Sequence, residues 1–224
     1  MIKGKQQFFS VYAALTNFTM LFLASCAFAL PTVFFSTHSY HEDNSDLTLG
    51  ISRWCSIYIL LAYLAFLFFQ LFTHVEIFRG PQDEDEDEDE ASLSPYVASL
   101  LLFLATVFVS LSSEWLVASI DGLVEEWHMG KSFVGVILLP IVGNACEHAG
   151  AVRMAMVEKV DITLGIAVGS STQIALFVVP FAVLAGWVID QPMDLNFGQM
   201  NTTVMFFSVL IAFSICTDGS SNWL

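Results

Sequence analysis

Long apolar stretches dominate this sequence and leave little choice of fold. Each is near the length of about 20 residues that a helix needs to cross a hydrocarbon layer. They occupy residues Phe8 to Phe35, Cys55 to Phe72, Pro95 to Ile120, Phe133 to Val157, Ile162 to Ile189 and Met200 to Cys216. Strand alternation of the barrel type is absent from the sequence, so helices are the spanning structure that remains. The sequence predicts an all-α polytopic membrane protein with about six transmembrane helices.

The composition supports a membrane protein and argues against a nucleic-acid binder. Hydrophobic residues make up 56% of the chain, and the mean hydropathy is +0.69. A soluble domain is rarely so apolar. The net charge of −15 comes largely from the acidic run Asp83 to Glu90. Because the chain is so apolar, the lipid bilayer is its expected partner. Nucleic acid is not an expected partner, since binding to its phosphates needs clustered Lys and Arg.

The acidic run lies in a low-complexity segment, residues 80–94, that separates the second and third apolar stretches. One interpretation is a solvated linker whose like charges repel. The other is a patch that concentrates divalent cations near the membrane. Cytosolic loops carry an excess of Lys and Arg. The N-terminal segment and every second loop, which lie on one side of the membrane, contain Lys3, Lys5, Arg79, Arg153 and Lys159. The loops on the other side contain Arg53 and Lys131. This excess predicts a cytosolic N-terminus and a cytosolic acidic linker.

The fourth apolar stretch contains the polar sequence LLPIVGNACEHA, residues 138–149. Helical spacing places three of its side chains on one face, namely Asn144, Glu147 and His148. An ionised carboxylate at the centre of a membrane helix costs about 2.5–3.5 kcal/mol on insertion scales, so it usually faces a cavity or a partner. Pro140 and Gly143 precede the three residues and loosen the backbone, which membrane helices tolerate where the freed groups line a site.

The fifth apolar stretch begins with GIAVGSSTQ, residues 165–173, after a turn too short for anything but an antiparallel hairpin. At about 1.5 Å per residue, Glu147 and Gln173 each lie roughly 15–17 Å from the turn. Ser170, Ser171 and Gln173 are therefore predicted at the level of Glu147, near the middle of the bilayer. Gly165 and Gly169 form a GxxxG pattern that lets helices approach closely, and Gly143 is predicted to act in packing too.

Each of these signals has a less specific interpretation. A single Glu in a membrane helix can be a protonated structural residue that donates a hydrogen bond to a neighbour. GxxxG alone is more often a packing motif than a functional one, and His148 alone is more often a hydrogen-bonding neighbour than a metal ligand. Their coincidence at one depth favours a functional site. Glu114, near the end of the third stretch, either lines an access pathway to that site or reaches water from the helix end.

The predicted site has oxygen ligands of the kind that a hard cation prefers. Ca²⁺ takes six to eight oxygens at about 2.3–2.6 Å, whereas Glu147, Asn144, Gln173 and a serine hydroxyl offer about four. Burial favours a protonated carboxylate and a bound cation favours an ionised one, so proton and cation compete for Glu147. This competition is a physical basis for antiport, because a naked charge at the midplane opposes reorientation of the empty carrier.

These motifs resemble the second conserved repeat of the Ca²⁺/H⁺ exchangers, the cation/proton exchanger branch of the Ca²⁺/cation antiporter superfamily. LLPIVGNACEHA, VDITLGIAVGSSTQIALFVVP and MDLNF carry the resemblance, together with QFF, the acidic run and SEWLVASIDG. It implies one half of an inverted-repeat antiporter fold, whose six segments correspond to the fifth to tenth of eleven helices. It also implies that Asn144 and Glu147 bind the cation and the proton, with His148 adjacent. Ser171 and Gln173 match residues that line the cation path.

The resemblance further implies a division at the acidic linker. Residues 1–79 would hold two helices at the end of the first half, and residues 95–224 the second repeat without its last helix. A second G-N-x-x-E motif does not occur in this sequence. The missing first repeat is therefore expected in cis, if the chain is a fragment, or in a second chain, if the half is genuine.

The sequence thus predicts a secondary transporter that exchanges Ca²⁺, with Mn²⁺ as a further substrate, for H⁺ across a vacuolar or other endomembrane. The alternatives are a Na⁺-coupled Ca²⁺ exchanger and a non-transporting half that associates with an intact exchanger and regulates it. No cofactor is expected, because Ca²⁺ is the transported substrate. An enzyme is not expected, since the sequence shows no nucleophile and base set and no closed zinc ligand set.

Overall fold

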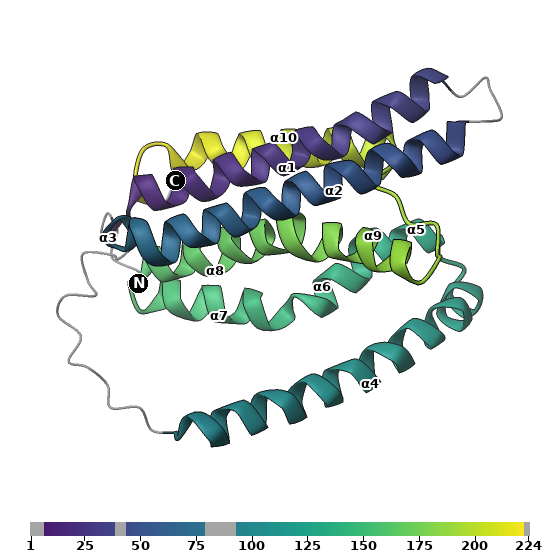
Figure 1. Ribbon diagram of the computed structural model, residues 1–224. Coiled ribbons are helices and arrows are strands. Elements are labelled where there is room, and N and C mark those ends of the chain that lie inside the picture. Colours follow the sequence, from purple (N-terminus) through teal and green to yellow (C-terminus); the bar gives the residue numbers. More distant parts are fainter. Residues whose placement is uncertain (1–6, 39–43, 79–92, 222–224) are drawn as a thin grey trace. The chain divides into compact units, whose positions relative to one another are not determined.

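The computed structural model describes residues 7–38, 44–78 and 93–221 (Figure 1). Its α-helices are α1 (Val11–His38), α2 (Asn44–Phe68), α3 (Val75–Phe78), α4 (Pro95–Trp127), α5 (Lys131–Phe133), α6 (Leu139–Gly143), α7 (Ala145–Met156), α8 (Val160–Gln173), α9 (Val179–Val188) and α10 (Gln199–Cys216). Three π-helical segments, η1 (Phe69–Thr73), η2 (Val134–Leu138) and η3 (Ile174–Val178), and two short strands, β1 (Gln7–Phe8) and β2 (Ser220–Ser221), complete the elements.

The described helices confirm the predicted all-α membrane architecture. Five of them are long and apolar enough to cross a bilayer, and Lys131–Gly143 with Ala145–Met156 makes a sixth span if this bent pair counts as one. Two predicted boundaries were wrong. The second helix begins at Asn44 instead of Cys55, and the third continues past Ile120 to Trp127. Hydropathy did not mark these two extensions because they are more polar than the apolar stretches. They are helical all the same, since a helix that crosses a bilayer can continue into the aqueous layer.

The chain forms two compact units. Unit 1 comprises residues 1–84 and 150–224, and unit 2 comprises residues 85–149. The division into residues 1–79, 80–94 and 95–224 stays a prediction. Most of the acidic linker lies outside the described residues.

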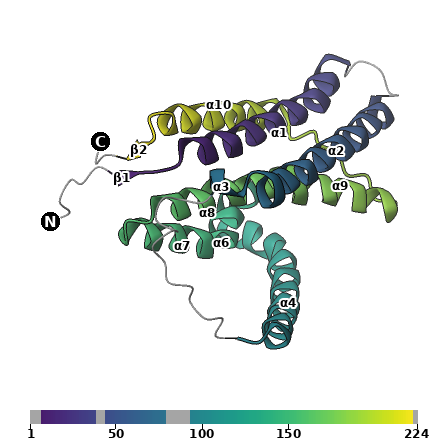
Figure 2. The same cartoon turned by 60° about the vertical axis from the view of Figure 1, so that its left-hand side comes forward.

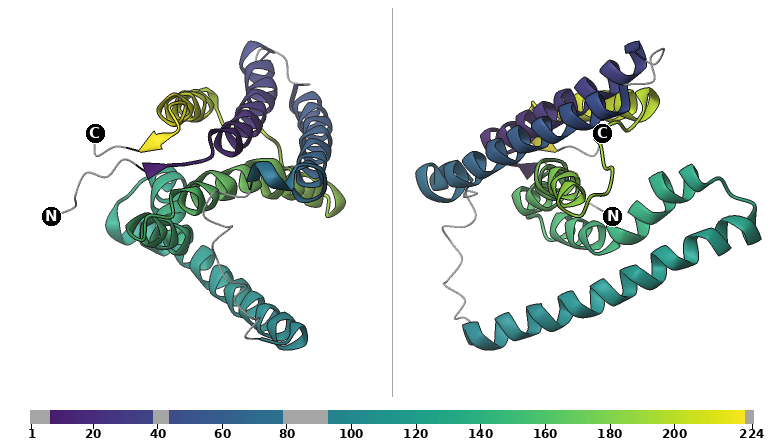
Figure 3. Two further views of the ribbon diagram at one scale, coloured as in Figure 1. Left: turned by 90° about the vertical axis from the view of Figure 1, so that its left-hand side faces the viewer. Right: turned by 45° about the vertical axis from the view of Figure 1, so that its right-hand side comes forward.

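In unit 1, α1 is the central helix and contacts α2, α8 and α10. The left view of Figure 3 shows α1 between α10 and α2. The segments α8, η3 and α9 follow one another without interruption from Val160 to Val188, and α2 packs along α9. Helix α1 thereby holds α8 from one side, which fixes the part of the fold that carries the SSTQ sequence.

The core of unit 1 combines residues from four helices and one loop. Phe28 of α1, Tyr63 of α2 and Leu176 of η3 belong to one buried cluster, as does Leu195 in the loop between α9 and α10. The Leu195 N–H donates to the Ser52 hydroxyl at 3.1 Å, so the loop's buried backbone group is paired. Membrane interiors gain little from hydrophobic transfer between helices, so close packing and such hydrogen bonds hold the unit together.

Unit 2 consists of α4, α5, η2, α6 and the first residues of α7. Helix α4 ends at His128, whose left-handed conformation (φ 51°) terminates the helix. Lys131 pairs with Asp121 across this turn, with 2.7 Å between Nζ and Oδ1. Both side chains are largely exposed, and such a pair contributes about 0–1 kcal/mol. The turn therefore depends mainly on its backbone conformation.

Strands β1 and β2 join the two ends of unit 1. Gln7 pairs with Ser221 and Phe8 with Ser220 in an antiparallel ladder, which Figure 2 shows beside the first turn of α1. The Phe9 N–H extends the ladder by donating to the Gly219 carbonyl at 3.2 Å. Gly219 has φ +64°, and a Cβ atom there would collide with the Val11 side chain. Glycine is therefore required at this position by both conformation and space.

We predict that Gly219→Ala lowers stability, because the left-handed conformation costs a residue with Cβ about 1–2 kcal/mol and the collision adds to that. The thermal midpoint of the detergent-solubilised protein, measured by size-exclusion chromatography after heating, should fall by several degrees. Gly50→Ala is the matched control, since Gly50 lies in α2 with open space around its Cβ position. Ala is also the better helix former there. Equal thermal midpoints for both variants would contradict the conclusion that glycine is required at residue 219.

Candidate functional site

The fourth span is broken at Asn144. Helix α6 ends at Gly143, Asn144 leaves the helical conformation (φ −101°, ψ 15°), and α7 begins at Ala145. The helices on the two sides of the break differ in direction by 50°. The Asn144 carbonyl accepts the His148 N–H at 3.0 Å, so Asn144 ends one helix and caps the next. A helix break leaves backbone carbonyls and N–H groups without partners in the helix, and these groups can contact an ion.

Glu147 and His148 lie in the first turn of α7, directly after this break. The N-terminal end of a helix carries partial positive charge, which stabilises an ionised carboxylate. Asn144, Glu147 and His148 are all exposed in the described structure. Exposed polar groups in a membrane span need a cavity or a protein partner around them. The local geometry therefore leaves the Glu147 carboxylate accessible.

Ser171 and Gln173 lie at the end of α8, where the helix passes into η3. The Ser171 hydroxyl donates to the Ala167 carbonyl at 2.8 Å, which uses its hydrogen and leaves oxygen lone pairs for another group. Buried Thr172 lies between them, and its single hydroxyl hydrogen is shared between the backbone carbonyls of Val168, at 2.8 Å, and Asn17, at 3.3 Å. The second bond links α8 to α1, so it fixes the rotation of α8 and the directions of its neighbours Ser171 and Gln173.

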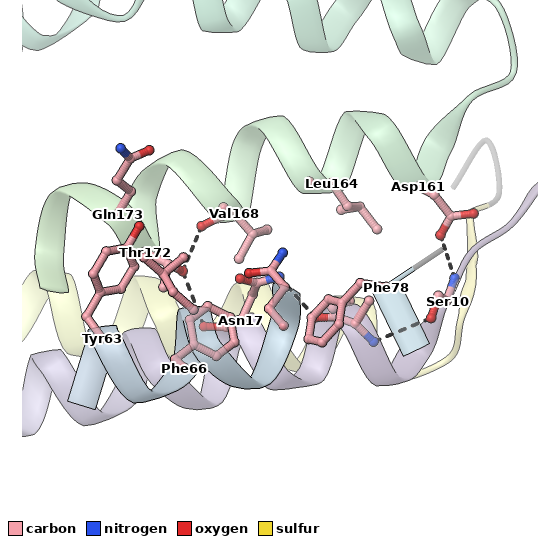
Figure 4. Close-up of a pocket in the computed structure, with 16 residues that line it drawn as sticks. Ser10, Asn17, Tyr63, Phe66, Phe78, Asp161, Leu164, Val168, Thr172 and Gln173 are labelled. Carbon is pink, nitrogen blue, oxygen red and sulfur yellow. Dashed lines mark hydrogen bonds between the residues drawn. The ribbon is translucent and has the colours of Figure 1, made fainter. Parts of the chain in front are cut away.

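A cavity of about 260 Å³ lies between α8, α1 and α2 in unit 1. Its polar lining comprises Ser10, Asn17, Gln70, Asp161, Thr172 and Gln173. Figure 4 shows Asp161 and Gln173 at opposite ends of the labelled side chains, with Asn17 between them. The Asp161 carboxylate accepts the Ser10 N–H at 2.6 Å. Polar groups in such a cavity provide hydrogen bonds for water.

The structure distributes the predicted site residues over both units. Unit 2 holds Asn144, Glu147 and His148, and Glu114 is an exposed residue of α4. Unit 1 holds Ser171 and Gln173, and Gln173 lines the cavity with Gly165 and Gly169. A Cβ atom at Gly143, Gly165 or Gly169 would meet no atom within 4 Å. The binding, access and packing roles of these residues stay predictions.

The described residues contain no group of three or more His, Cys, Asp or Glu side chains placed to hold a metal ion. Amide, hydroxyl and backbone oxygens suit a hard cation, and they are the groups that surround Glu147 and Gln173 in the sequence.

Sequence reasoning did not find the cavity residues Asn17, Gln70, Asp161 and Thr172. A signal was present, since Asn17 and Gln70 are amides within long apolar stretches. On α8, Asp161, Gly165, Val168 and Thr172 also recur at intervals of three and four, which places them on one helical face. What the sequence did not show was that Asn17 of α1 and Gln70 of η1 line the same cavity as this face.

Fold and site together define a polytopic helical membrane protein with a polar, broken helix, an arrangement typical of secondary transporters. Residues 97–224 match the family described as sodium/calcium exchanger protein. The chain therefore belongs to the sodium/calcium exchanger protein family, which confirms the resemblance seen in the sequence.

Individual relatives extend the similarity over nearly the whole chain. The vacuolar calcium ion transporter of Schizosaccharomyces pombe is 38% identical over 96% of this chain and 52% of its own length. Vacuolar cation/proton exchanger 2 of Oryza sativa subsp. japonica is 40% identical over 98% of this chain and 51% of its own length. The chain thus spans about half the length of these curated relatives.

The fold is also similar to solved structures. The structure of native YfkE has a TM-score of 0.78 and 34% identity, and the match covers 99% of this chain and 61% of that one. A second structure, described as the Ca²⁺/H⁺ antiporter protein YfkE, has a TM-score of 0.76 with the same identity and coverage.

We predict that Thr172→Val destabilises the protein by about 1 kcal/mol, because the buried hydroxyl loses its bond to α1. The thermal midpoint should fall by about 2–4 °C. Thr106→Val is the control, since the Thr106 hydroxyl donates to the Leu102 carbonyl of its own exposed helix and to no other helix in the described part of the chain. Such local bonds contribute little to helix stability. An unchanged midpoint for Thr172→Val would contradict the proposed link between α8 and α1.

Proposed function

We propose that this chain forms one half of a secondary transporter that exchanges Ca²⁺ for H⁺ across a vacuolar membrane, with Mn²⁺ as a further substrate. The observation that carries the proposal is the helix break at Asn144, with an exposed carboxylate one turn later. The printed names of the relatives support the substrates and the membrane, since they describe a vacuolar calcium ion transporter and a vacuolar cation/proton exchanger.

In this proposal Glu147 binds the cation and the proton alternately. A cation needs the carboxylate oxygens free of a proton, so a cation that binds there displaces the proton and a proton that binds there displaces the cation. Asn144 adds an amide oxygen, and Ser171 and Gln173 add further oxygens to the path. Each of these groups is a hard ligand of the type that Ca²⁺ prefers.

The coordination shell needs oxygens from outside this half. The proposed residues provide about four ligands, and Ca²⁺ takes six to eight. The chain spans 52% of one relative and 51% of another. We therefore propose that the preceding half of the antiporter, in cis or in a second chain, supplies the remaining ligands and surrounds the exposed groups of α7. The acidic linker is proposed to face the cytosol.

We predict that Glu147→Gln abolishes Ca²⁺ uptake driven by a pH gradient, because an amide neither ionises nor exchanges a proton. The measurement is ⁴⁵Ca²⁺ uptake into vesicles that carry this chain as the second half of a complete exchanger, with a loss of at least about tenfold expected. Glu126→Gln is the control, since Glu126 is an exposed carboxylate in the last turn of α4. Both variants should insert equally, and undiminished uptake by Glu147→Gln would exclude Glu147 as the shared ligand.

Na⁺-coupled exchange is the second candidate, favoured by the description of the matching family as sodium/calcium exchanger protein. The two candidates differ in the ion that competes for the carboxylate. With H⁺ as the coupling ion, collapsing the pH gradient should stop uptake, and an imposed Na⁺ gradient should not restore it. Uptake that follows the Na⁺ gradient at constant pH would replace proton exchange by sodium exchange.

A further inference from the structure

The cavity between α8, α1 and α2 carries a charge that nothing described neutralises. Asp161 lines one end of the cavity, and its hydrogen bond in the described structure comes from the Ser10 backbone. No ion pair to Asp161 is present among residues 7–38, 44–78 and 93–221. A carboxylate that keeps its net charge inside low-dielectric walls raises the local concentration of cations.

The cavity follows α8 along one face. Leu164, Gly165, Val168, Gly169 and Thr172 line it between Asp161 and Gln173. At about 1.5 Å per residue, its two ends are roughly 18 Å apart along the helix. This distance exceeds half of a hydrocarbon core of about 30 Å. The cavity thus connects the turn before α8 with the level of the SSTQ sequence.

Its interior suits water and a partly hydrated cation. The volume of about 260 Å³ holds several water molecules. Asn17 of α1 and Gln70 of η1 contribute amide oxygens, and Thr172 lines the cavity beside Gln173. Gly165 and Gly169 leave open space on the α8 side of the cavity, because they have no side chains and no atom lies within 4 Å of where either Cβ would be.

We propose that this cavity is a hydrated access path for the cation, and that Asp161 attracts the cation at its outer end. This inference rests on the proposed cation transport and adds a path and a residue to it. The alternative role of Asp161 is structural, since a carboxylate at the start of α1 also stabilises that helix through its N-terminal dipole. The two roles differ in what the replacement by Asn does. Asn keeps an oxygen that accepts the Ser10 N–H and removes the charge.

The test uses the full chain in membrane vesicles, with its four native cysteines replaced by alanine and a single new cysteine introduced. Leu164→Cys and Val168→Cys report on the cavity, and Leu23→Cys on the exposed surface of α1 is the control. The probes are membrane-impermeant methanethiosulfonates, one with a trimethylammonium group and one with a sulfonate group. The rate of thiol modification is measured for each, without any need for transport.

We expect both cavity cysteines to react and Leu23→Cys to remain unmodified. The cationic probe should react with Leu164→Cys about tenfold faster than the anionic one, relative to a free thiol, because the carboxylate attracts it. Asp161→Asn should lower this ratio severalfold, and raised salt should do so too. Unreactive cavity cysteines would overturn the path. A ratio that Asp161→Asn leaves unchanged would overturn the role of Asp161 and leave it a helix cap.

A second variant tests the route itself. Gly165→Leu should fill the cavity between its outer end and Val168, and so slow modification of Val168→Cys while Leu164→Cys stays reactive. Gly165→Ala is the control, because a single methyl group fits the open space at that position. Equal rates with Leu and Ala at residue 165 would contradict the route. Thiol modification is measured independently of ⁴⁵Ca²⁺ uptake. A cavity that water does not enter is therefore distinguishable from a chain that does not transport Ca²⁺.

Discussion

Every backbone group within a bilayer has to find a hydrogen-bond partner in the protein, and this requirement shapes the whole chain. Regular helices meet it over most of each span. Prolines interrupt it in three of the described spans, at Pro31 of α1, Pro140 and Pro180, because proline has no N–H to donate. Pro140 follows η2 and Pro180 follows η3, so each of these two prolines lies just after a π-helical segment. The wider π-helical turn changes the hydrogen-bonding register before the proline, and such segments occur frequently at functional sites.

The two proline regions lie beside the polar residues of the chain. Pro140 precedes Asn144 by about one helical turn, and Gln173 is the last residue before η3. Irregular backbone and side-chain oxygens therefore occur together in both helices. A cation that sheds water needs many oxygens at once. In the proposed site, backbone carbonyls beside the break would add to the few side-chain oxygens available.

The sequence was sufficient to predict the helical class, the spans and a loosened backbone at Pro140 and Gly143, because hydropathy and helix breakers are local properties. Helix ends were less predictable. Asn44 and Trp127 lie in polar flanks where hydropathy carries no signal, and helix formation there depends on neighbouring turns. The cavity was not predictable, since it depends on the rotation of α8, and the Thr172 bond to α1 joins residues 155 positions apart. Such contacts are set by packing, which one sequence does not display.

Asp161 illustrates how one residue serves structure and electrostatics together. Its bond to the Ser10 N–H connects the start of α8 to the start of α1, close to where the β1–β2 ladder joins α1 to the end of α10. These contacts brace the helix ends at one edge of unit 1. A carboxylate that accepts a backbone N–H holds this edge together without placing a positively charged side chain beside it. A lysine or arginine partner would brace the same helices and cancel the field. The backbone donor therefore leaves the cavity without a described positive charge beside Asp161, which is the arrangement that the proposed attraction of cations requires.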